Sequence, residues 1–159
     1  MHLSRKFSLP AIVVCALCIH SGTGHAILSI NEPWVRASPD GRSADVFVNL
    51  KSSDSAMVAE VDTFAARRIE IRDDATSRPL KSIALPANSL VEMKPGGAHL
   101  RMTGLVRRLK QGEHVPITLI IRLADGTSQK LYINAEVRHR SPSEDELDPR
   151  GHHHPPAKK

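Results

Sequence analysis

Residues 115–137 have the sequence VPITLIIRLADGTSQKLYINAEV, which is the clearest β-hairpin pattern in this chain of 159 residues. Apolar and polar side chains alternate along both halves of the stretch, and a period of two residues is typical of a half-buried strand. Between the halves lies Asp125-Gly126, a turn signal because glycine adopts a positive φ at little cost. We therefore predict strands over 115–123 and 128–137, with Leu119 at the centre of an apolar face.

The same alternation continues upstream of the hairpin. Further short strands are predicted over residues 44–51, 57–64, 68–72, 89–94 and 99–105. In the first of them Phe47 is the one apolar side chain on the polar side, and Pro95-Gly96-Gly97 is a turn signal between the last two. About eight short strands, with no helical stretch longer than a turn or two, indicate an all-β fold, either an antiparallel sandwich or a Greek-key barrel.

Residues 1–26 have the pattern of an export signal peptide. Arg5 and Lys6 precede an apolar run over residues 9–19, and Gly24 and Ala26 are small residues at the −3 and −1 positions of a cleavage site. We predict cleavage after Ala26 and a periplasmic or otherwise exported protein; an uncleaved N-terminal anchor is the alternative. No later stretch approaches the roughly 20 apolar residues of a membrane span, so none is expected after signal removal.

Composition excludes several classes of function. Both cysteines, Cys15 and Cys18, lie in the signal segment, which excludes a thiolate metal site, a disulfide framework and a cysteine nucleophile in the folded part. The chain has 22 Lys and Arg against 17 Asp and Glu, with only one Trp, one Tyr and three Phe. Such scattered charge and few aromatic rings argue against nucleic-acid binding. Neither a GxSxG nor an HExxH motif occurs, so we do not expect an enzyme.

The remaining chain divides into a predicted β-sandwich domain over 27–137 and a tail over 138–159. The tail is rich in proline and charged residues, and, prolines aside, Leu147 is its only apolar side chain larger than alanine. It cannot bury enough apolar surface to offset ordering, so we predict that it is disordered. It contains His152-His153-His154, a short tract of the kind that binds late first-row metals.

Five segments, in the same order, resemble the exported copper chaperones of the PCuAC family. They are PWVRA at 33–37, ADVFVNL at 44–50, RIE at 68–70, MKPGGAHL at 93–100, and the stretch from Gly104 to Leu119. The resemblance covers roughly residues 28–137. It implies an antiparallel Greek-key, cupredoxin-like β-sandwich that carries Cu(I) to the assembly of cytochrome c oxidase, with copper and oxidase-assembly proteins as partners.

The copper-ligand motif of that family is degenerate in this chain. The family site has two His and two Met in the spacing H-x10-M-x21-H-x-M, and imidazole and thioether suit the soft Cu(I) ion. His99 matches the second His, but Arg101 stands where its Met partner belongs and Met102 comes one residue late. Arg72 stands where the first His belongs, and no His occurs between His25 and His99.

The candidate metal ligands are therefore His99 and Met102 in the sandwich, with Met93 as a further possibility, and His152, His153 and His154 in the tail. Each has a simpler interpretation. His99 would close the Gly-Gly turn against a backbone carbonyl, and methionines commonly fill gaps in a core. Arg72 and Arg101 would repel a cation and favour an anion or a carboxylate, or would face solvent.

The sequence is consistent with two functional hypotheses. The first is an exported, copper-chaperone-like protein concerned with copper handling and delivery to cytochrome c oxidase assembly. The alternative is a diverged, non-metallated β-sandwich binding module that interacts with a partner protein. The missing first His–Met pair counts against the first hypothesis, and copper titration separates the two.

Signal cleavage has a direct test. The exported protein should begin at Ile27 and contain no cysteine, because Cys15 and Cys18 both precede the predicted site. Intact-mass measurement of the exported protein should give the mass of residues 27–159. A mass that retains both cysteines would contradict cleavage.

Overall fold

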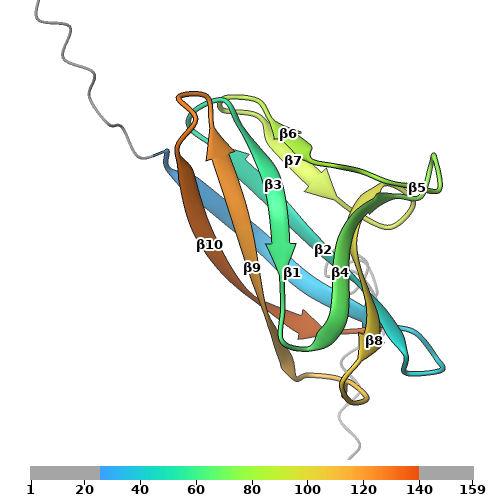
Figure 1. Ribbon diagram of the computed structural model, residues 1–159. Coiled ribbons are helices and arrows are strands. Elements are labelled where there is room, and N and C mark those ends of the chain that lie inside the picture. Colours follow the sequence, from blue (N-terminus) through green and yellow to red (C-terminus); the bar gives the residue numbers. More distant parts are fainter. Residues whose placement is uncertain (1–25, 140–159) are drawn as a thin grey trace, which may run out of the picture.

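The computed structural model describes residues 26–139, and within this range every regular element is a β-strand (Figure 1). The strands are β1 (Leu28–Ala37), β2 (Ser43–Ser52), β3 (Ala56–Asp62), β4 (Ala66–Asp73), β5 (Arg78–Pro79), β6 (Ile83–Leu85), β7 (Leu90–Met93), β8 (Ala98–Leu105), β9 (His114–Leu123) and β10 (Ser128–Val137). The predicted all-β class is confirmed. The predicted signal peptide and nearly all of the predicted tail lie outside the described residues.

The strands form a single curled sheet. Its order is β5-β4-β8-β2-β1-β10-β9-β3-β6, and β7 pairs with the remaining part of β2. Every pairing is antiparallel except that of β1 with β10, where Trp34 lies opposite Glu136 and Val35 opposite Val137. The sheet curls until β3 and β4 lie side by side (Figure 1). The parallel pair was not predicted, because alternation along one strand does not reveal which strand lies beside it.

The hairpin predicted from residues 115–137 is present as β9 and β10. In its turn Gly126 has a φ of 85°, and the Leu123 N–H donates to the Thr127 carbonyl at 2.9 Å. The Asp125 carboxylate accepts hydrogen bonds from the Thr127 hydroxyl and N–H, which lower the pKa of Asp125. The register places Leu119 opposite Leu131.

The core lies inside the curl and is built from alternate positions of the strands. Leu119 and Ile121 of β9 are fully buried, as are Val46 of β2 and Leu100 of β8. Leu119 is thus in the core, as the alternation predicts. Phe47, the exception in the pattern of β2, is buried too, but it packs on the other side of the sheet.

Strand β1 was not predicted from the alternation of apolar and polar residues; it spans Leu28–Ala37 and includes the segment PWVRA. Glu32 has a positive φ of 50°, and the pairing with β2 shifts register between Asn31 and Trp34. A bulge of this kind breaks the two-residue period, which explains why the pattern upstream of Trp34 gave no clear strand signal. The predicted strand over 57–64 also ends earlier, at Asp62. The Thr63 hydroxyl donates to the Pro116 carbonyl and accepts a hydrogen bond from the Ala65 N–H, which turns the chain toward β4. Within residues 26–139 no helix is long and apolar enough to cross a membrane.

The buried face of β9 can be tested by cutting back one side chain. Leu119→Ala should lower the free energy of unfolding by about 2–5 kcal/mol, because it leaves a cavity in a fully packed core. Urea unfolding of the purified protein measures the change. Leu90→Ala is the matched control: Leu90 is 52% exposed, and the same change there should cost about 0.5 kcal/mol or less. Equal losses for the two variants would mean that this face of β9 is not the core.

Candidate functional site

Strand β8 places the candidate residues, because it pairs with β4 on one side and with β2 on the other. His99 lies opposite Arg72 of β4, and Arg101 lies opposite both Glu70 of β4 and Asp45 of β2. Side chains alternate along a strand, so His99 and Arg101 share one face of the sheet while residues 100 and 102 face the core. The candidate site is therefore the outer face of β2, β8 and β4.

Arg101 is held by an acidic side chain of the neighbouring strand. Its Nε lies 2.5 Å from Oδ1 of Asp45 and its Nη2 lies 3.3 Å from Oδ2. A second guanidinium, that of Arg36 in β1, lies 3.8 Å from the same carboxylate and 5.2 Å from the centre of the Phe47 ring. The Asp45 side chain is only 16% exposed, so this carboxylate is shared between two cations at a partly buried position.

On the other side of β8, Arg72 is held by an acidic side chain of its own strand, β4. It lies 3.4 Å from the carboxylate of Glu70 and donates to the backbone carbonyl of Ser77. Arg68 also pairs with Glu70, at 2.7 Å. The carboxylate partners that Arg72 and Arg101 favour are thus supplied by this chain itself.

His99 is 1% exposed and lies between these two pairs. Its Nδ1 is 2.9 Å from the Gly97 carbonyl oxygen, so Nδ1 carries the proton and the lone pair is on Nε2. This is the contact with a backbone carbonyl that the simpler interpretation predicts. Nε2 has no hydrogen-bond partner within the described residues; the Asp45 and Asp74 carboxylates lie 3.6 and 3.8 Å away.

Two aromatic rings continue the row from His99 toward β1. The His99 ring is 5.9 Å from the Phe47 ring, and the Phe47 ring is 4.5 Å from that of Trp34. Beside Trp34 is a small hollow of about 150 Å³, bordered also by Met93, Glu92 and Lys94. The imidazole therefore sits between an aromatic row and a set of charged pairs.

The methionines lie elsewhere. Met102 is fully buried and pairs with Ala44 and Ile69 across the strands on the core side, so the structure does not bring it to His99. Met93 is 1% exposed and belongs to the same core. Both positions match the expectation of gap-filling core residues. His152, His153 and His154 lie outside the described residues.

The donors around His99 do not fit the two-His, two-Met set of a Cu(I) carrier. The groups nearest its Nε2 are carboxylates, which prefer harder cations, and one of them is already engaged by arginines. Within residues 26–139 no group of three or more His, Cys, Asp or Glu side chains is arranged to hold a metal. What the face offers is one imidazole nitrogen and a surface of alternating charge.

Sequence reasoning did not single out Asp45. Its position on the polar side of the predicted strand 44–51 was visible, and so was Arg101 in the strand over 99–105. That the two meet depends on the register between β2 and β8, which neither stretch reveals.

Comparisons with known sequences and structures agree on the fold. The sequence model of the family described as "Putative lipoprotein LpqE-like" matches residues 28–133. A protein named "Putative lipoprotein Lxx21020" of Leifsonia xyli subsp. xyli is 25% identical over 115 residues, which are 67% of this chain and 68% of that protein.

Solved structures of PCuAC domains superpose on the described fold. The copper-bound PCuAC domain from PmoF2 is 22% identical with a TM-score of 0.60, covering 74% of this chain and all of that domain. The apo PCuAC domain from PmoF1 is 18% identical with a TM-score of 0.62, covering 73% of this chain and all of that domain. The Cu(I) form of DR1885 from Deinococcus radiodurans is 24% identical with a TM-score of 0.55, covering 71% of this chain and 77% of that one. The PCuAC-like, cupredoxin-type fold expected from the sequence is confirmed.

The Asp45–Arg101 pair should couple more strongly than a surface ion pair. In a double-mutant cycle with Asp45→Ala and Arg101→Ala, we expect a coupling free energy of about 1–2 kcal/mol, between the values for exposed and buried pairs. Urea unfolding of the two single variants and the double variant gives this quantity. The matched control is the exposed Glu92–Lys94 pair, where the N–O distance is 2.9 Å and the side chains are 48% and 66% exposed. Equal coupling in the two cycles would show that Asp45 does not anchor the face.

Proposed function

Because this chain belongs to the LpqE-like family and has the PCuAC fold, we propose that it is an exported, copper-chaperone-like protein. In this proposal it takes part in copper handling for the assembly of cytochrome c oxidase, and copper is its cargo. The role is binding and transfer, not catalysis. The observation that carries the proposal is the His99 imidazole, held by the Gly97 carbonyl through Nδ1 so that the lone pair of Nε2 has no partner among the described residues.

The N-terminal sequence supports the exported location. The positive residues, the apolar run and the small residues before Ile27 form a signal-peptide pattern. The names of the family and of the Leifsonia relative describe lipoproteins, and lipoproteins are exported proteins. The proposed location is the periplasm or another site outside the cytoplasm.

In this proposal the sandwich contacts copper weakly. Soft-metal affinity accumulates over three or four placed ligands, and His99 is a single imidazole. Arg101 and Arg72 add positive charge beside it, although Asp45 and Glu70 offset much of that charge. A weak contact through a single imidazole allows transfer but not storage.

Firmer binding is assigned to the tail. His152, His153 and His154 offer three imidazoles in sequence, which suit Cu(II) or Ni(II) better than Cu(I). Ordering of the tail opposes this binding, so we expect moderate affinity. Met102 is proposed as a ligand only if the core side of β8 opens, since its side chain is fully buried there.

A specific observation favours the second candidate, a non-metallated module that binds a partner protein. The face that would receive copper is spanned by the pairs of Asp45 with Arg101 and of Glu70 with Arg72. Such a face is complementary to a protein surface of alternating charge, and charge patterns of this kind give binding its specificity.

Copper titration separates the two candidates. The proteins are the chain from Ile27 to Lys159, His99→Ala, and a triple variant with His152, His153 and His154 replaced by alanine. The triple variant should lose most Cu(II) binding, whereas His99→Ala should lose only the weak Cu(I) binding. Cu(II) binding should fall as the pH drops through about 6.5, where free imidazole protonates and no longer binds metal. Competition with a chromophoric chelator measures both affinities.

His114→Ala is the matched control, since His114 is an exposed histidine at the start of β9, outside the face of β2, β8 and β4 that holds His99. Absence of copper binding in every protein would overturn the copper proposal and leave the binding module. Tight Cu(I) binding that His99→Ala abolishes would instead reveal a sandwich site, with Met93 and Met102 as the first ligands to test.

A further inference from the structure

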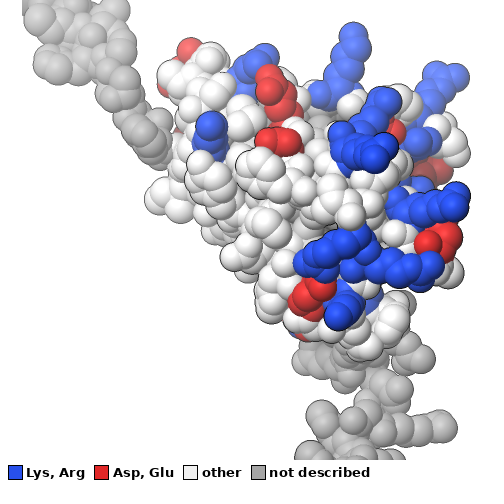
Figure 2. All heavy atoms as spheres, turned by 60° about the horizontal axis from the view of Figure 1, so that its bottom comes forward, with Lys and Arg blue, Asp and Glu red and all other residues white. Residues whose placement is uncertain are grey.

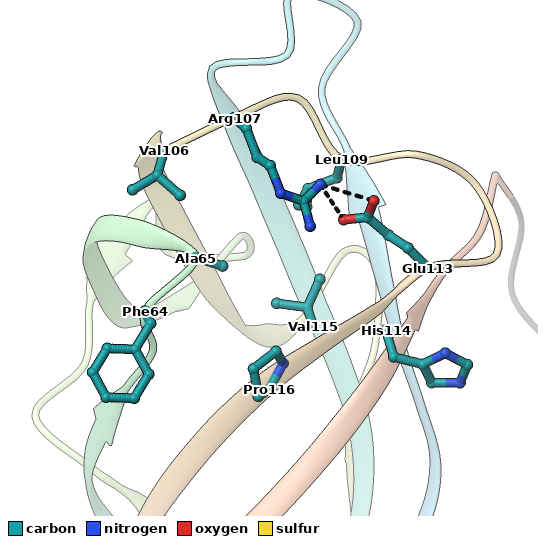
Figure 3. Close-up of a pocket in the computed structure, with 9 residues that line it drawn as sticks. All are labelled: Phe64, Ala65, Val106, Arg107, Leu109, Glu113, His114, Val115 and Pro116. Atoms are coloured by element: carbon teal, nitrogen blue, oxygen red, sulfur yellow. Dashed lines mark hydrogen bonds and ion pairs between the residues drawn. The ribbon is translucent and has the colours of Figure 1, made fainter.

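One end of the barrel has an apolar pocket of about 200 Å³ that no strand covers (Figure 3). Its lining comes from the turn after β3, the turn after β8 and the start of β9. Val115 forms the buried part, while Phe64 and Val106 at the rim are 88% and 65% exposed. Small-molecule sites commonly have about 300–1,000 Å³, so this pocket suits a side chain better than a metabolite.

Basic side chains surround this pocket. The three turns at this end, together with the strand residues next to them, span residues 38–43, 63–67 and 104–114 and contain five Lys or Arg and two Asp or Glu. Figure 2 shows the concentration of basic side chains on this side of the molecule. The five basic residues, all exposed, are Arg42, Arg67, Arg107, Arg108 and Lys110.

Both acids at this end already have partners. Glu113 is 2.9 Å from Arg107, and that hydrogen bond holds the pKa of Glu113 below its ordinary value (Figure 3). Asp40 accepts hydrogen bonds from the Ser38 hydroxyl and the Arg42 N–H. No carboxylate within residues 26–139 forms an ion pair with the side chains of the other four basic residues. The end as a whole is therefore complementary to an acidic segment that has an apolar side chain.

The described chain leaves the barrel at this same end. The Val137 N–H donates to the Glu113 carbonyl at 2.8 Å, and the Gly112 N–H donates to the Val137 carbonyl at 2.9 Å. The last residue of β10 is thus fixed beside the pocket wall. Leu147 follows ten residues later, and ten extended residues span at most about 33–36 Å, so a tail starting here reaches the pocket with chain to spare.

The segment that follows has the matching chemistry. Residues 144–148 are Glu-Asp-Glu-Leu-Asp, with four carboxylates around Leu147 and no basic residue. We propose that this segment docks on the basic end of its own barrel, with Leu147 in the pocket and the carboxylates against the arginines. The proposal does not depend on the copper function and concerns a different surface from that of His99.

Tethering explains how a short segment can bind. The isolated tail has too little apolar surface to order itself. In the docked state the barrel supplies further apolar surface, because Leu147 packs against Phe64 and Val106. A tether of a few residues gives an effective concentration in the millimolar range, so even a weak contact is well populated. The contact is electrostatic in part and weakens with salt, because exposed charges are screened over about 8–10 Å. Docking of this kind covers two exposed apolar side chains, Phe64 and Val106, until a competing partner or high salt displaces the tail.

A spin label in the tail tests the contact. The chain from Ile27 contains no cysteine, so Gly151→Cys carries a single nitroxide. With a millimolar effective concentration, we expect the label to reduce the amide NMR signals of Phe64 and Val106 at least about twofold. Gly126, in the hairpin turn at the opposite end, should keep its signal (Figure 1).

The matched variant adds Leu147→Ala, Glu144→Gln, Asp145→Asn, Glu146→Gln and Asp148→Asn to the labelled chain. It keeps the tether length, so simple proximity is unchanged, and the signals of Phe64 and Val106 should recover. Lys158→Gln with Lys159→Gln changes tail charge outside the segment and should leave the signal loss as it was. Added salt should also restore the signals.

Several results would overturn the proposal. Equal signal loss in the variant with the five substitutions in residues 144–148 would mean that tethering alone brings the label near. A loss that grows with protein concentration would mean that the tail docks on a second copy. If the tail substitutions change nothing and phosphatidylglycerol vesicles perturb Phe64 and Val106, an anionic membrane is the occupant of this surface.

Discussion

The double pairing of β8 is the constraint on which the rest of the structure depends. Its hydrogen bonds to β2 and β4 fix one register on each side, and that register sets Leu100 and Met102 toward the core while His99 and Arg101 face outward. A shift by one residue would exchange the two faces and bury the guanidinium. The core and the candidate site are therefore two sides of the same strand.

This arrangement explains how a PCuAC-like fold can persist without three of the four soft ligands that the resemblance implies. The barrel is stabilised by apolar packing inside the curl, which does not involve the outer face. The outer face can then exchange metal ligands for ion pairs, provided that each charge finds a partner. Asp45 and Glu70 meet that condition for Arg101 and Arg72. His99 is the one position where an imidazole is kept.

The two ends of the barrel differ in character for a related reason. Near His99 each arginine has a carboxylate partner. Asp45 on a neighbouring strand serves Arg36 and Arg101. Glu70 serves Arg68 and Arg72 of its own strand. At the end where β10 stops, four of the five basic residues stand on turns, which have no facing strand to supply a carboxylate, and Arg67 lies at the start of β4. This end therefore combines unpaired charge with the exposed side chains of Phe64 and Val106, which is typical of an interaction surface, whereas the charges beside His99 have partners within the chain.

The sequence by itself determined most local features: the strands β2–β4 and β7–β10, the turn at Asp125-Gly126 and the all-β class, but not β1, β5 and β6. Alternation and glycine conformation act over a few residues, so they can be recognised in one stretch. His99 and Met102 are an odd number of residues apart, so the sequence already places their side chains on opposite faces of one strand. Only the tertiary structure decided which strands are neighbours, including the parallel pairing of β1 with β10. It alone joined Asp45 to Arg101, 56 residues apart, because that contact depends on the register between two strands and not on either sequence.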